Sequence, residues 1–211
     1  MKNRAVEPGR KIQIPGVRNR LREEREDKMP GKDSVRLFPF ERIAIFIDGW
    51  NLAKASRDWL EKEVNFEKLL EYFSRDAIVL RAFYYIGEQT SEEGRRKQHP
   101  FLTWLRTNGY KVVTKPIKTY INKDRRPELK ADFDVDIAVD MFALADKIDR
   151  AVLFSGDGDF AKLIDRVGMK GVRTQVVSHW AKGIGPTAQE LVEAADVFTE
   201  LADIIDEFVK Q

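Results

Sequence analysis

Five consecutive apolar residues, Ile43-Ala-Ile-Phe-Ile47, run directly into Asp48 and Gly49. A short run with no polar residue is typical of a strand that is buried on both faces of a sheet. Short apolar runs continue to alternate with longer amphipathic stretches from residue 41 almost to the end of the chain. Because strands that alternate with helices form βαβ crossovers, this pattern predicts a mostly parallel sheet covered by helices on both faces.

The expected elements follow from apolar period, length and end signals. Strands are expected at 43–47, 78–86, 110–114, 151–154 and 172–177. Helices are expected at 52–60, 66–73, 92–107, 134–147, 160–167 and 186–209, the last with a break near Asp196. A polar connection is expected at 115–130. The prediction is an α/β fold, a three-layer α/β/α domain of Rossmann-like type.

The charge is distributed unevenly along the chain. Residues 1–40 hold 11 Lys and Arg against 6 Asp and Glu, among Pro and Gly residues and without a sustained apolar period. Such a segment buries too little apolar surface to offset its ordering entropy. We therefore expect a flexible basic tail over 1–40, a domain over 41–205 and a short tail over 206–211. The basic tail either contacts nucleic-acid phosphates or is a solvated linker.

Composition excludes several classes of protein. The chain has no cysteine, which rules out disulfide frameworks, zinc sites with thiolate ligands and cysteine nucleophiles. No apolar run approaches the roughly 20 residues of a membrane-spanning helix, and the N-terminus lacks the apolar segment of a secretory signal. We expect a soluble cytoplasmic protein that does not act in a membrane.

Acidic residues follow the strands at the places where a parallel sheet binds ligands. In open α/β sheets that place is beyond the carboxyl ends of the strands. Asp48 directly follows the first strand, and Asp157 and Asp159 follow the fourth after Ser155-Gly156. Each aspartate alone has an ordinary explanation, since Asp commonly caps helices and Asp-Gly commonly forms turns. A third acidic group stands at the start of the helix before the fourth strand: Asp132, Asp134 and Asp136.

Several carboxylates on one face of a sheet repel one another unless a divalent cation neutralises them. Ligands that are all oxygen favour Mg²⁺ or Mn²⁺ over Zn²⁺. Such a site supports in-line displacement at phosphorus, with a water as the nucleophile. Asn51 would hydrogen-bond the scissile phosphate, fix a carboxylate or cap a helix. Ser155 would orient a metal ligand or close a turn.

Three segments resemble the signature motifs of NYN domains, and most closely those of the LabA/DUF88 branch of the PIN-like superfamily. The segments are Phe46-Ile-Asp-Gly-Trp-Asn51, Asp132-Phe-Asp-Val-Asp-Ile-Ala-Val-Asp140 and Leu153-Phe-Ser-Gly-Asp-Gly-Asp-Phe160. The resemblance covers about residues 41 to 202. It implies a metal-dependent ribonuclease fold, usually acting on RNA.

The resemblance also assigns residues. It implies that Asp48 is a metal ligand, with Asn51 as its polar partner, and that Asp157 and Asp159 are the acidic pair of the third motif. In the middle motif, Asp134 is the first choice as a metal ligand and Asp136 the second. The expected catalytic residues are Asp48, Asn51, Asp134, Asp157 and Asp159. The expected metal ligands are Asp48, Asp134, Asp136, Asp157 and Asp159.

A nuclease with an acidic active site repels its polyanionic substrate, so basic side chains are needed nearby to attract it. The connection at 115–130 carries basic residues around an aromatic one, Tyr120, as in sites for single-stranded nucleic acid. The expected contacts with RNA are Lys115, Lys118, Lys123, Arg125, Arg126 and Lys130. A solvated polar loop is the alternative. The apolar stripe at 201–208 forms either core, which we favour, or a homodimer face.

Three other functions are alternatives. A regulatory module with weak catalysis would use the same fold to bind RNA or a protein. A phosphatase with an aspartyl nucleophile would want a second carboxylate two residues after Asp48, where Trp50 stands. A dinucleotide-binding enzyme would need a G-x-G-x-x-G after the first strand, which is absent.

Overall fold

The computed structural model describes residues 41–121 and 127–210. The predicted N-terminal tail lies outside these residues. Among the described residues, no helix has the length and apolarity needed to cross a membrane.

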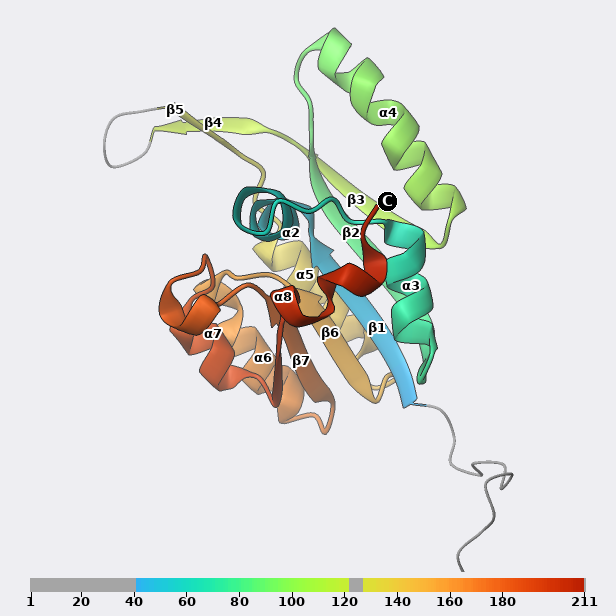
Figure 1. Ribbon diagram of the computed structural model, residues 1–211, viewed down its shortest axis with the longest axis vertical. Helices are drawn as coiled ribbons and strands as arrows, with labels where there is room; N and C mark the ends of the chain where they lie inside the picture. The colour runs from blue at the N-terminus through green and yellow to red at the C-terminus, as the bar shows by residue number, and fades with distance from the viewer. Residues whose placement is uncertain (1–40, 122–126, 211) are drawn as a thin grey trace, which may run out of the picture. The chain divides into compact units, whose positions relative to one another are not determined.

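A six-stranded sheet with every strand parallel forms the centre of the domain (Figure 1). Its strands, in spatial order, are β3 (Tyr110–Pro116), β2 (Ala77–Glu88), β1 (Glu41–Asp48), β6 (Arg150–Phe154), β7 (Arg173–Ser178) and β8 (Val197–Glu200). From β1, the next strands in sequence, β2 and β3, are added on one side of the sheet. The later strands β6, β7 and β8 are added on the other side. The strand order therefore reverses between β1 and β6.

Helices cover both faces of this sheet (Figure 1). They are α2 (Gly49–Ala53), α3 (Phe66–Ser74), α4 (Glu92–Thr107), α5 (Asp134–Leu144), α6 (Ala161–Gly168), α7 (Gln189–Ala194) and α8 (Leu201–Ile204). A π-helical segment, Lys54–Trp59, continues α2, and 3-10 turns span Gly158–Phe160, Ala181–Gly183 and Ile205–Phe208.

The period of two along the strands divides the core into two layers. In β1, Ile43, Ile45 and Ile47 pack with α3, α8 and the C-terminal turn. The residues between them, Ala44 and Phe46, pack with α5, α6 and α7 on the opposite face. Both faces of β1 are thus fully buried, which explains its uninterrupted apolar run. The predicted three-layer α/β/α fold is confirmed.

Two short strand pairings were not predicted. The expected polar connection at 115–130 contains a two-stranded antiparallel sheet, β4 (Lys118–Ile121) with β5 (Pro127–Lys130). The expected break near Asp196 is followed by the edge strand β8, which pairs with β7. Four-residue strands carry too few residues for a period of two to be distinguished from a helical spacing.

The domain extends beyond the expected end at residue 205. Phe208 is fully buried in the core, and its carbonyl accepts a hydrogen bond of 2.8 Å from the Asn65 backbone N–H. Val209 forms a β-bridge with Val64. The stripe that includes Leu201 and Ile205 is likewise core, as favoured above. Residues 206–210 therefore belong to the packed domain.

Asp149 contributes a pH-dependent part of the stability. The Arg42 guanidinium donates to both of its carboxylate oxygens, at 2.8 and 3.0 Å, and lowers the pKa of Asp149 from 3.8 to about 2. Because the pKa is lower in the folded state, this stabilisation is complete above about pH 4 and is lost as the pH falls through about 2. The pair is half exposed, so the effect is modest.

We expect Asp149→Asn to be slightly less stable than the wild type at pH 7 and equally stable near pH 2. Urea unfolding followed over this pH range measures the difference between the two proteins. A difference that stays constant down to pH 2 would contradict the assignment of this stabilisation to the Asp149 carboxylate.

Candidate active site

The carboxyl ends of β1 and β6 lie side by side where the strand order reverses. Asp48 is the last residue of β1, and Ser155 to Asp159 directly follow β6. A crevice forms at such a point, because the connections from neighbouring strands leave in opposite directions. The topology therefore places both predicted acidic segments at the position where α/β domains bind ligands.

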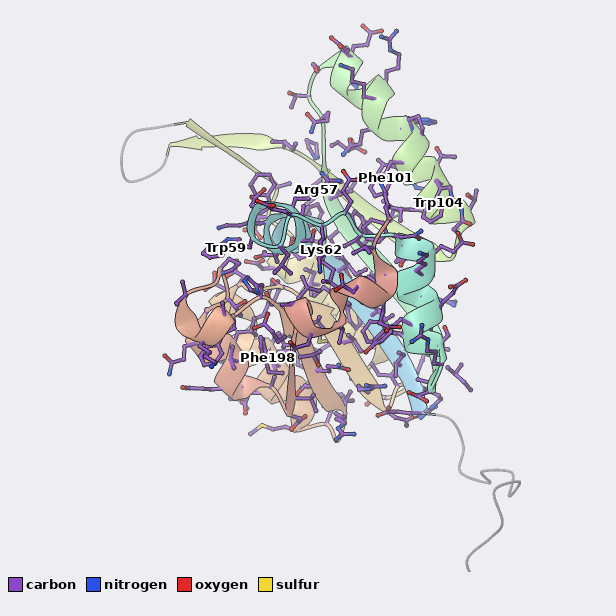
Figure 2. All side chains as sticks on the ribbon, viewed as in Figure 1. Arg57, Trp59, Lys62, Phe101, Trp104 and Phe198 are labelled. Atoms are coloured by element: carbon purple, nitrogen blue, oxygen red, sulfur yellow. The ribbon has the colours of Figure 1, made fainter. Side chains whose placement is uncertain are left out.

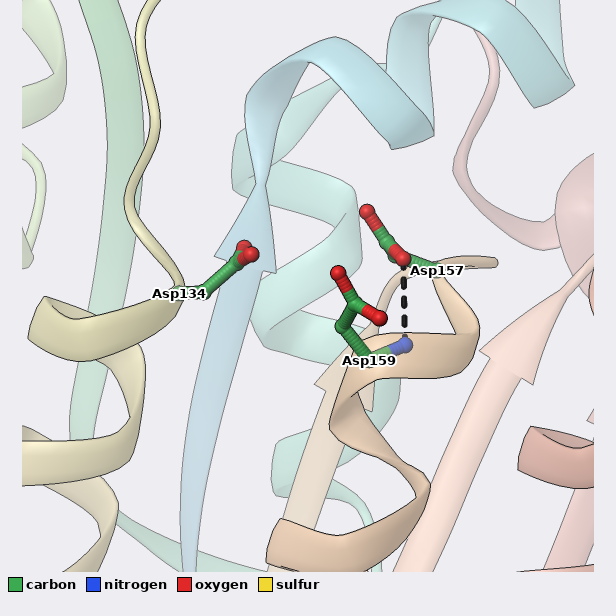
Figure 3. A group of neighbouring side chains, drawn as sticks. All are labelled: Asp134, Asp157 and Asp159. Carbon is green, nitrogen blue, oxygen red and sulfur yellow. Dashed lines mark hydrogen bonds between the residues drawn. The ribbon is translucent and has the colours of Figure 1, made fainter.

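Three carboxylates converge at this edge (Figure 3). One carboxylate oxygen from each of Asp134, Asp157 and Asp159 lies within 4.8 Å of those of the other two. Asp134 is the first residue of α5, whereas the other two belong to the turn after β6. Asp134 and Asp157 are half-buried and Asp159 is exposed, so the group is open to solvent on one side. These three residues are called the acidic triad below.

The residues after β6 fix the geometry of the turn. The buried Ser155 hydroxyl accepts a hydrogen bond of 3.2 Å from the Asp157 N–H. The Asp157 carboxylate in turn accepts one of 3.1 Å from the Asp159 N–H, which closes the 3-10 turn (Figure 3). A Cβ at Gly158 would lie 2.5 Å from an oxygen of Glu190, so a larger residue would displace the turn or that side chain. Ser155 thus orients the segment that carries two members of the acidic triad.

Asp48 caps α2 and stands beside the acidic triad without belonging to it. Its Oδ1 accepts hydrogen bonds from the N–H groups of Trp50 and Asn51, at 3.1 and 3.2 Å. Its Oδ2 accepts one of 2.6 Å from the Asn51 side-chain amide. Burial raises the pKa of Asp48 against these hydrogen bonds, and the negative charge of Asp157 raises it further. Of the roles weighed for Asn51, the contact seen is the one that fixes a carboxylate.

The carboxylates of the middle motif contact different partners. Only Asp134 reaches the acidic triad. Asp136 forms an ion pair with Lys115, and Asp140 accepts a hydrogen bond of 2.9 Å from the buried Tyr85 hydroxyl. Successive helical positions point in different directions, so these carboxylates cannot all face the same point. Asp134 is therefore the carboxylate of this motif that lies close to Asp157 and Asp159.

The predicted RNA contacts are described only in part. Lys115 lies next to α5 through its pair with Asp136. Lys118 and Lys130 are paired in the backbone register, at the start of β4 and the end of β5. Lys123, Arg125 and Arg126 lie outside the described residues.

A pocket of about 440 Å³ adjoins the acidic triad and was not predicted from the sequence. One wall comes from the start of α2 and the π-helical segment, with Trp50, Asn51 and Lys54. The rest of the wall comes from two loops: Gly156, Asp157, Gly158, Gly185, Pro186, Thr187 and Ala188. The only early signal was Trp50 itself, a large aromatic residue directly after Asp48-Gly49.

Comparisons with known proteins agree with this arrangement. Residues 42–202, which include all three motifs, match the NYN domain. The low amplitude and bright protein LabA of Synechococcus elongatus is 33% identical over 169 residues, 77% of this chain and 85% of that protein. The crystal structure of a Vibrio parahaemolyticus protein of unknown function superposes with a TM-score of 0.65 at 29% identity, over 81% of this chain and 97% of that one.

Proposed function

The chain belongs to the NYN domain family, and on that premise we propose that it is a metal-dependent ribonuclease that hydrolyses phosphodiester bonds of single-stranded RNA. NYN domains form a PIN-like family whose members are typically nucleases. The observation that carries the proposal is the convergence of Asp134, Asp157 and Asp159 at the carboxyl edge of the sheet.

The donor set of the acidic triad fits a hard divalent cation. Three carboxylate oxygens within 4.8 Å of one another repel when no cation is present. Oxygen ligands with open positions for water are typical of Mg²⁺ and Mn²⁺ sites. A cation bound there would lower the pKa of a water and neutralise charge that develops on the phosphate oxygens.

Each residue around the triad has a role in this proposal. Asp134, Asp157 and Asp159 would hold the metal. Asp48 adds a fourth carboxylate at the end of β1, kept in one orientation by Asn51. We also propose that the lysine and arginine side chains of residues 115–130 attract the RNA. The proposed cellular location is the cytoplasm.

Cleavage of a labelled single-stranded RNA tests the function. We expect cleavage by the purified wild type with Mn²⁺ or Mg²⁺, none with excess chelator, and none with Asp157→Asn at the same metal concentration. Activity that is equal in the wild type and Asp157→Asn would come from a contaminant and would contradict the proposal. Binding of RNA without cleavage at any metal concentration would instead identify a regulatory module.

A further inference from the structure

Trp50 is exposed to an unusual degree for the largest apolar side chain. Its relative exposure is 71%, although it lies only three residues after the fully buried run 43–47 of β1. It lines the pocket beside the acidic triad, together with Asp157. A flat aromatic surface that is left open next to a polar centre is suited to stacking against a planar ligand.

The backbone holds Trp50 at a fixed position relative to the carboxylates. The Trp50 N–H donates to Asp48 Oδ1 at 3.1 Å. The preceding residue, Gly49, packs so closely on β2 that a Cβ there would lie 2.7 Å from the Tyr85 carbonyl oxygen. The start of α2 therefore cannot shift without disturbing the sheet, so the backbone from which the indole projects has a fixed position.

The part of the pocket wall that the two loops form leaves room for a ligand. It is formed largely by residues with little or no side chain, Gly156, Gly158, Gly185 and Ala188. A volume of about 440 Å³ lies within the range of roughly 300–1,000 Å³ found for small-ligand pockets. The space is thus large enough for a flat ring that enters between this wall and the indole.

The loop that forms this wall is fixed in an unusual conformation. Ala181 and Lys182 adopt φ of 46° and 56°, which few residues other than glycine accept. The Glu200 carboxylate holds the loop by accepting hydrogen bonds of 3.1 Å from the N–H groups of Trp180 and Ala181. Strained backbone of this kind concentrates at ligand sites.

Lys54 supplies a positive charge on the same side of the pocket as Trp50. It is exposed and begins the π-helical segment Lys54–Trp59. Such wider turns are rare and are frequently found at functional sites. An aromatic ring with a lysine on the next helical turn matches the chemistry of a nucleotide, which offers a base to stack and a phosphate to pair.

We propose that this pocket binds one nucleotide of a single-stranded nucleic acid, with its base stacked on Trp50 and its phosphate paired with Lys54. The base must leave any duplex to reach the indole, so the pocket selects single strands. The proposal names the substrate class of the nuclease proposed above, and in that respect rests on it. Binding itself needs no cleavage, so the two proposals can fail separately.

Binding of labelled oligoadenylate RNA to the full-length protein in a chelator tests the pocket by fluorescence anisotropy. Stacking on an aromatic side chain contributes about 1–3 kcal/mol per base. We therefore expect Trp50→Ala to weaken binding about tenfold and Trp50→Phe to restore most of the affinity. Trp104→Ala is the matched control and should bind like the wild type, because Trp104 lies on α4, apart from α2 (Figure 2).

Two further measurements separate stacking from charge. A fully abasic sugar-phosphate strand of equal length should bind the wild type and Trp50→Ala equally, because it has no base to stack. Lys54→Ala should lower the slope of log affinity against log salt by about 0.7, which is the value for one phosphate contact on a single strand.

Several outcomes would overturn the proposal. They are an affinity of Trp50→Ala equal to that of the wild type, an equal loss on the abasic strand, and no binding of oligoadenylate by the wild type. Circular dichroism of each variant verifies that it is folded. If Trp50→Ala still cleaves RNA with an unchanged KM, the proposed nucleotide pocket is wrong and the proposed nuclease function stands. If RNA binding depends on Trp50 but no cleavage occurs, the pocket stands and the nuclease function is wrong.

Discussion

Asp134→Asn is expected to lower the rate of RNA cleavage roughly a thousandfold, whereas Asp136→Asn should keep most of the activity. Both residues belong to the first turn of α5, and both substitutions remove one negative charge at constant volume. Only Asp134 has an oxygen within 4.8 Å of those of Asp157 and Asp159. Asp136 is paired with Lys115 instead. The two variants therefore separate a metal ligand from a neighbouring ion pair.

Initial cleavage rates at saturating Mn²⁺ measure this difference, and thermal unfolding of both variants verifies that the fold is retained. The two positions share a helix and a motif, and both substitutions change the net charge equally. A difference in cleavage rate therefore reflects only where each carboxylate lies. Equal losses in both variants would mean that the charge of the whole acidic edge, and not the acidic triad, governs the rate.

Phe208→Ala is expected to lower the free energy of unfolding by about 3–5 kcal/mol. The Phe208 ring is fully buried and makes an edge contact with Tyr72, with 5.7 Å between ring centroids. Its removal would leave a cavity under α3 that the surrounding helices can fill only in part. Many domains are stable by only about 5–15 kcal/mol, so this loss is a large share of the total.

Urea unfolding measures this loss, with Met169→Ala as the control. Met169 is 70% exposed, and its substitution should change stability by less than about 0.5 kcal/mol. If Phe208→Ala does not fold, the milder Phe208→Leu should still unfold at a lower urea concentration than the wild type. A midpoint equal to that of the wild type would show that residues after 205 contribute nothing to the core.

Local signals in the sequence predicted most of the fold. The apolar run at 43–47 predicted a strand correctly, because both faces of this part of β1 are buried. The cap at Asn65, whose side chain accepts from the N–H groups of Glu67 and Lys68, marks the start of α3. The predicted helix at 92–107 coincides with α4, and Gly109, with a φ of 91°, follows its end as a C-terminal stop signal. The cap that Ser91 forms at its start was not predicted.

The composition of the acidic triad was harder to predict. The positions of Asp48, Asp157 and Asp159 shortly after strands predict an acidic site, and the resemblance adds Asp134 as the first choice within the middle motif. The structure places Asp48 beside the group and brings Asp134 into it. Which carboxylates meet depends on how α5 packs across the sheet, and no local pattern encodes this packing. The pocket was missed for the same reason, since its walls come from segments more than a hundred residues apart in the sequence.

A crystal of the protein soaked in Mn²⁺ tests the central claim most directly. The account predicts an anomalous peak among the carboxylates of Asp134, Asp157 and Asp159, with an oxygen of each within bonding distance of the Mn²⁺. The peak should disappear in Asp157→Asn crystals under the same soak. A site without bound Mn²⁺ at saturating concentration, or Mn²⁺ bound only elsewhere on the chain, would contradict the account.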